Sequence, residues 1–188
     1  MIDDIDEWLN LGLINVGQGS AVNLEVEWLI NYDSWVQYLD TLGIENNLFN
    51  IEVHEEQNEI HYFFQNCGAG TVTSIDLNIS QSFSHLLSAS QNKDGLKIPI
   101  PHRLIKFPIS AIRAGWHKYG QNKINCETQH LEHQLKISYA GVNGKKYSST
   151  FKVMLEVLVP RYSHAQDGFH VIAPKDEFLL RIEVEEMD

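Results

Sequence analysis

The 188-residue chain lacks any apolar stretch near the roughly 20 residues that a helix needs to span a bilayer. It also lacks a basic start, because its first residues are acidic, whereas a secretory signal peptide begins with positive charge. These two absences predict a soluble chain without direct membrane insertion. The cytoplasm is then the default location, although the chain would also suit the soluble part of a membrane-associated protein.

Positive charge is scarce as well. The chain has 14 Lys and Arg residues against 25 Asp and Glu residues, which gives a net charge of −11. Nucleic acids and anionic lipid surfaces both attract basic proteins, so this charge argues against either partner. Hydrophobic residues make up 43% of the chain, an ordinary share for a folded globular protein, so disorder is not expected.

Only two cysteines are present, Cys67 and Cys126. Their spacing would suit the inter-sheet disulfide of an immunoglobulin domain, but the tryptophan expected on the strand after the first cysteine is absent. Cys67 also falls within a predicted turn. We therefore expect two free thiols, which fits a reducing compartment.

A short glycine motif occurs twice. Residues 15–22 read Asn-Val-Gly-Gln-Gly-Ser-Ala-Val, and residues 66–73 read Asn-Cys-Gly-Ala-Gly-Thr-Val-Thr. Each copy follows an apolar run and precedes an alternating one, which is typical of two strands joined by a bend. The pattern predicts a single β-sandwich domain over 1–188 with two related strand-turn-strand units, 8–30 and 60–80.

The rest of the chain predicts short strands and one short helix. Apolar residues at i, i+3, i+4 and i+7 predict the helix over 33–43, with Asp33 or Ser34 as its N-cap and Gly43 after its end. An Asn-Gly pair at 143–144 predicts a late hairpin. The segment 80–95 is predicted to be a long connection, and 113–115 a turn. Strands are predicted at 8–14, 22–30, 48–54, 59–64, 73–79, 104–112, 133–139, 146–159 and 177–184, with an extended edge at 97–101.

Two stretches resemble a known family. Residues 15–23 are similar to the Asn-x-Gly-x-Gly-Pro-Ala-x-Asn segment of bacterial immunoglobulin-like domains from uncharacterised, often membrane-associated proteins. Residues 137–147 resemble the closing Tyr-x-Asp-x-x-Gly-x-x-Tyr hairpin of those domains. Ser20 stands where that family usually has Pro, and Ala140 stands where it has Asp. The resemblance implies an all-β, immunoglobulin-like antiparallel β-sandwich, and it carries no catalytic residues.

The best metal-like cluster is formed by His130 and His133, with Glu127, Glu132 and Cys126 nearby. Residues three apart share one face of a helix but point to opposite faces of a strand, so the local structure decides whether they can converge. The order of residues differs from the His-Glu-x-x-His of metalloproteases. The cluster supports an alternative function, a metal-binding protein or a hydrolase.

A second candidate site is the aromatic cluster of Trp116, His117 and Tyr119, which follows a predicted turn. If exposed, it would suit a carbohydrate or small ligand. The chain has no Gly-x-Ser-x-Gly elbow, no P-loop lysine and no dinucleotide fingerprint, and no cofactor is implied. The sequence does not determine the function. Its leading interpretation is a non-catalytic interaction or sensory module whose partner is a protein or a second copy of the chain.

Overall fold

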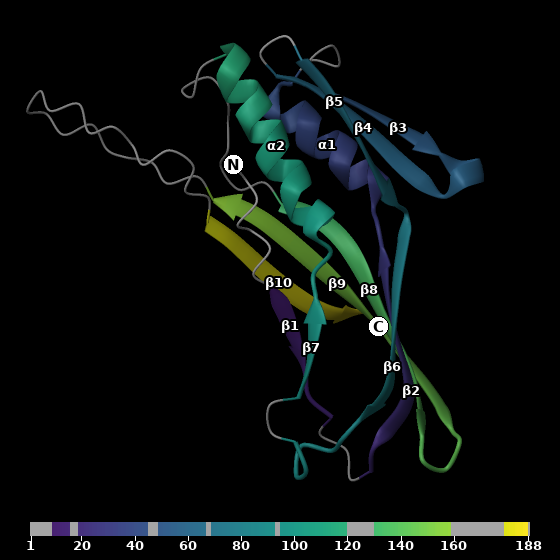
Figure 1. The fold of residues 1–188 in the computed structure, drawn as a ribbon. Coiled ribbons are helices and arrows are strands. Elements are labelled where there is room, and N and C mark those ends of the chain that lie inside the picture. The colour runs from purple at the N-terminus through teal and green to yellow at the C-terminus, as the bar shows by residue number, and fades with distance from the viewer. Residues whose placement is uncertain are drawn as a thin grey trace, which may run out of the picture.

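The computed structural model describes residues 9–15, 19–44, 49–66, 69–92, 95–119, 130–158 and 179–187. Within these ranges the protein is built mostly of strands, which pair antiparallel in three sheets, together with two α-helices (Figure 1). The sheet orders are β10-β9-β8-β2-β6, β3-β4-β5 and β1-β7. The elements are β1 (Asn10–Leu13), β2 (Ala21–Leu29), α1 (Tyr32–Leu42), β3 (Phe49–His54), β4 (Glu59–Asn66), β5 (Ala69–Asp76), β6 (Asn78–Leu86), β7 (Leu96–Pro99), α2 (His102–Tyr119), β8 (His130–Gly141), β9 (Lys146–Leu158) and β10 (Leu179–Met187).

Alternating side chains build the five-stranded sheet. In β2, Leu24, Val26 and Trp28 are buried, and Glu25 between them is exposed. The predicted late hairpin is confirmed, because β8 and β9 pair along their length around a turn whose Gly144 has a positive φ of 78°. The strands predicted at 48–54 and 59–64 correspond to β3 and β4, which pair antiparallel.

The predicted helix over 33–43 is confirmed as α1, although its N-cap is Asn31 rather than Asp33 or Ser34. The Asn31 side chain accepts a hydrogen bond from the backbone N–H of Ser34 at 3.2 Å. Gly43 ends the helix with a left-handed φ of 67°, as predicted.

A second helix replaces the strand predicted over 104–112 and the turn predicted at 113–115. Both segments belong to α2, so these two predictions are wrong, as is the prediction of one short helix. Most residues of 104–112 are apolar, but Arg103, Lys106, Ser110 and Arg113 recur every three to four residues, which is the polar stripe of a helix and not the alternation of a strand. Pro108 usually argues against a helix interior, yet α2 continues through it.

The long connection predicted at 80–95 is wrong in its first part, which belongs to β6. This strand pairs with β2 at the edge of the sheet. Its side chains alternate, since Ile79 and Phe83 are half-buried and Ser80 and Ser82 are exposed. The apolar signal is weak because the polar residues Gln81 and His85 share the face of Ile79 and Phe83.

The helices lie between the two larger sheets and join them (Figure 1). Helix α1 contacts β8 and β3, and α2 contacts β9 and β4. Phe107 of α2 stacks on Trp35 of α1 with 3.8 Å between ring centroids, and it meets Phe49 and Tyr62 edge-on at 5.4 and 5.5 Å. These aromatic rings form the centre of the core.

The two glycine units are built differently. In the second unit, β4 and β5 pair directly with each other, and Asn66 lies opposite Ala69. In the first, β1 and β2 belong to different sheets. The predicted free thiols, Cys67 and Cys126, lie outside the described residues.

Candidate functional site

His130 and His133 both lie on β8, where their spacing places them on opposite faces. The His130 side chain is 46% exposed, and it bonds Glu132 on the outer face of the sheet at 3.1 Å. His133 is buried on the inner face. The two rings therefore do not converge on one point. Their metal role stays a prediction, and Cys126, which would complete the set, is not among the described residues.

His133 is held as a neutral core residue. Its Nδ1 accepts a hydrogen bond from the backbone N–H of Asn31 at 3.4 Å, and its ring meets Trp35 edge-on at 6.2 Å. Burial lowers the pKa of His133 to about 3, against a smaller raising effect of Glu132. Because Nδ1 is the acceptor, the ring proton belongs on Nε2, which has no hydrogen-bond partner among the described residues.

The junction of α1 and β8 explains why these residues meet. The N-terminal part of β8 extends past its pairing with β2, which starts at Gln134. There the backbone N–H of Glu132 donates to the Ser34 hydroxyl of α1 at 2.8 Å. A helix side chain thus satisfies a strand group that would otherwise need a neighbouring strand.

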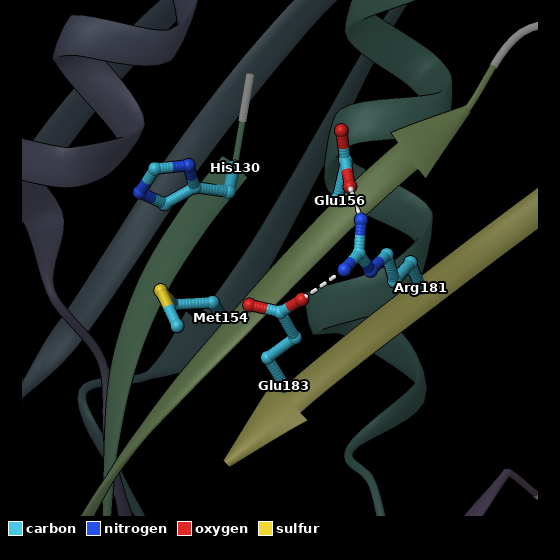
Figure 2. A pocket seen from close by; sticks show the side chains of 5 residues that line it. All are labelled: His130, Met154, Glu156, Arg181 and Glu183. Atoms are coloured by element: carbon cyan, nitrogen blue, oxygen red, sulfur yellow. Dashed lines mark ion pairs between the residues drawn. The ribbon is translucent and has the colours of Figure 1, made fainter. Parts of the chain in front are cut away.

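Two hollows border His130 on either side. One of about 300 Å³ lies over β8, β9 and β10, and Figure 2 shows Arg181 there between two carboxylates. Its guanidinium pairs with Glu156 at 3.7 Å and with Glu183 at 2.5 Å. The other hollow, of about 520 Å³, lies between α1 and β8. The first is lined by His130, Met154, Glu156, Arg181 and Glu183, and the second by Asn31, Asp33, Ser34, Gln37, Tyr38, Thr41, His130 and Glu132.

Ion pairs hold several of the charged side chains around these hollows. Lys152 bonds Glu132 at 2.7 Å, and this hydrogen bond is the main reason why the pKa of Glu132 is lowered. A histidine–carboxylate pair can act as a general base, but within the described residues no hydroxyl or thiol is hydrogen-bonded to His130 as a nucleophile.

The predicted aromatic cluster lies at the C-terminal end of α2. Trp116 and Tyr119 are half-buried and pack against the core. The side chain of His117 lies outside the described ones. Ligand binding by these residues stays a prediction.

A different aromatic group stands at the end of the β8–β9 hairpin. We call Tyr139, Val142, Lys145 and Tyr147 the aromatic tip. The two tyrosines lie directly opposite each other, and their rings stack with centroids 5.1 Å apart. Lys145 places its Nζ 5.3 Å from the Tyr147 ring centroid, and Val142 is 72% exposed. Among the described large hydrophobic residues, Val142 is the most exposed.

Hydrogen bonds within the turn at residues 141–145 stabilise the end of the hairpin that carries the aromatic tip. Gly141 donates to the carbonyl of Lys145 and Gly144 donates to the carbonyl of Gly141, both at 2.8 Å. The Asn143 side chain accepts from the N–H of Lys145 at 3.1 Å. A Cβ on Gly141 would lie only 3.0 Å from that Asn143 oxygen. Sequence reasoning found this hairpin but missed the tip as a site; the available signal was a valine beside an Asn-Gly turn and a tyrosine.

Another pair of histidines lies on the outer face of the three-stranded sheet. His54 and His61 have ring centroids 4.2 Å apart, with Glu59 2.8 Å from His61. In the described part of the chain, no three His, Cys, Asp or Glu side chains are arranged to hold a metal ion.

Neither helix in the described ranges combines the length and apolar character needed to cross a membrane. Comparisons with models of known families, with curated proteins and with solved structures find no match to this chain.

Proposed function

We propose that this protein is a non-catalytic interaction module that binds a partner protein through the aromatic tip. The observation that carries the proposal is the exposed Val142 beside the stacked tyrosines Tyr139 and Tyr147. Tyrosine is among the residues that dominate binding energy at protein interfaces, and an apolar side chain left in water favours burial against a partner.

Charge gives the partner a chemical character. Lys145 and Lys146 place two positive charges at the tip, although the chain as a whole carries −11. An apolar pocket with an acidic rim would complement this tip and would meet less repulsion there than over the acidic remainder of the chain. Binding of this kind weakens as salt concentration rises.

The immunoglobulin-like sandwich implied by residues 15–23 and 137–147 remains part of the proposal. It is supported by the antiparallel pairing of the sheets and by the hairpin that residues 137–147 form around the turn. In immunoglobulin-like domains, loops at one end of the sandwich are common contact surfaces. The aromatic tip is such a hairpin end.

The test compares tip variants with a control on the same sheet. Tyr147→Ser removes the stacked ring, Lys145→Glu reverses the charge, and Ser80→Glu changes an exposed edge residue elsewhere. A specific partner from the native cells should bind the wild type and the control, and it should be lost with both tip variants. A partner retained by both tip variants would overturn the assignment of the contact surface. Glycan binding that depends on Tyr147 would favour a carbohydrate-binding module instead.

A further inference from the structure

The strand β10 lies at one edge of the five-stranded sheet. It is nine residues long, it packs against β9, and no described strand pairs with its other side. Its side chains alternate between the half-buried Leu180 and Ile182 and the exposed Arg181 and Glu183. A long edge with unpaired backbone groups is a template for another strand.

The sequence of β10 is complementary to itself. When two copies run antiparallel about Ile182, each Arg181 lies opposite the Glu183 of the second copy. Each Leu180 then lies opposite a Val184, and the two Ile182 residues face each other. Opposite charges and apolar pairs directly across two strands both stabilise a sheet.

Neighbouring registers are less complementary. A pairing centred on Arg181 sets the two arginines against each other. One centred on Glu183 pairs Arg181 with Glu185, but it sets the two glutamates against each other and Leu180 against Glu186. A shift by a single residue would place Arg181 opposite an apolar residue of the inner face. The register centred on Ile182 therefore sets opposite charges against each other on the outer face and apolar residues against each other on the inner face.

We propose that two copies of this protein associate through antiparallel pairing of their β10 strands, with Ile182 on the two-fold axis. The two five-stranded sheets then join into one continuous sheet. This interface is isologous, the common form of homodimer. It is independent of the aromatic tip, and it would present two tips on one assembly.

Charge reversal gives a test in which each variant controls the other. Arg181→Glu alone places glutamate against glutamate at both contacts, and Glu183→Arg alone places arginine against arginine. An equimolar mixture of the two variants restores both opposite-charge pairs, as does the double variant. Lys136→Glu is the control, since it makes the same kind of charge change at a pair with Glu27 inside the sheet.

Sedimentation velocity over a wide concentration range should show a reversible wild-type dimer of micromolar strength, because a single edge pairing is a small interface. Each single reversal should weaken dimerisation about tenfold or more, and the mixture should recover it. Circular dichroism checks that each variant is folded. A wild type that stays monomeric, single variants that dimerise as well as the wild type, or a mixture that stays monomeric would each overturn the proposal.

Discussion

Acid should destabilise this protein through His133, well above the pH at which carboxylates protonate. Its folded-state pKa of about 3 lies below the value of about 6.5 for an unfolded histidine. Between these values the unfolded chain binds a proton that the folded core excludes. Stability is therefore highest above pH 6.5 and falls as the pH drops toward 3, by about 1.4 kcal/mol for each pH unit.

The size of this loss of stability depends on how completely the His133 ring is buried. His133 is 1% exposed, and no described acceptor is available to its Nε2 proton donor. Lowering the pH from 7 to 5 should cost about 2 kcal/mol, and the full interval should cost about 5 kcal/mol. Costs of this size are a large part of the stability of an ordinary domain.

The assay is urea unfolding followed by tryptophan fluorescence at several pH values. His133→Gln retains a carbonyl oxygen that can accept from Asn31 and cannot titrate, so the loss of stability from pH 7 to 5 should shrink by about 2 kcal/mol. Gln134→Asn, at an exposed position of the same strand, changes no titratable group and should retain the wild-type dependence. A His133 variant that loses as much stability with acid as the wild type does would refute this role of His133.

Three further predictions concern packing and hydrogen bonding elsewhere in the fold, each measured by the same urea unfolding at neutral pH. Phe107→Ala should cost about 3–5 kcal/mol, because it opens the centre of the aromatic core; a cost below 1 kcal/mol would contradict that packing. Gly95→Ala should cost more than Gly43→Ala, since both glycines have positive φ but only the Cβ at 95 would lie 2.5 Å from a backbone oxygen; the reverse order would contradict this. Ser34→Ala should cost about 1–3 kcal/mol by leaving the N–H of Glu132 without its acceptor, and no change would show that water replaces it.

The predictable parts of the fold are those with a clear local period. Helix α1 has apolar residues at helical spacing and a glycine stop, and the β8–β9 hairpin has alternation on both sides of an Asn-Gly turn. Helix α2 also has a helical period, since Arg103, Lys106, Ser110 and Arg113 recur every three to four residues, but the apolar residues between them and the internal Pro108 favour a strand in local reading.

The candidate sites show the same limit. The sequence placed His130 and His133 together but left open whether they share a face, which only the strand assignment of β8 answers. The aromatic tip depends on which side of the hairpin each tyrosine takes and on how far Val142 projects from the sheet. Exposure is a property of the assembled fold, so no spacing rule reveals it.

In-cell photo-cross-linking tests the proposed function most directly. A photoreactive phenylalanine analogue replaces Val142 at the tip or, as the control, Asn78 at the opposite end of the same sheet. Position 142 should give one discrete protein adduct that disappears when Tyr147→Ser is added, and position 78 should not give it. The same adducts from both positions, or none from position 142, would contradict an interaction module that works through the aromatic tip.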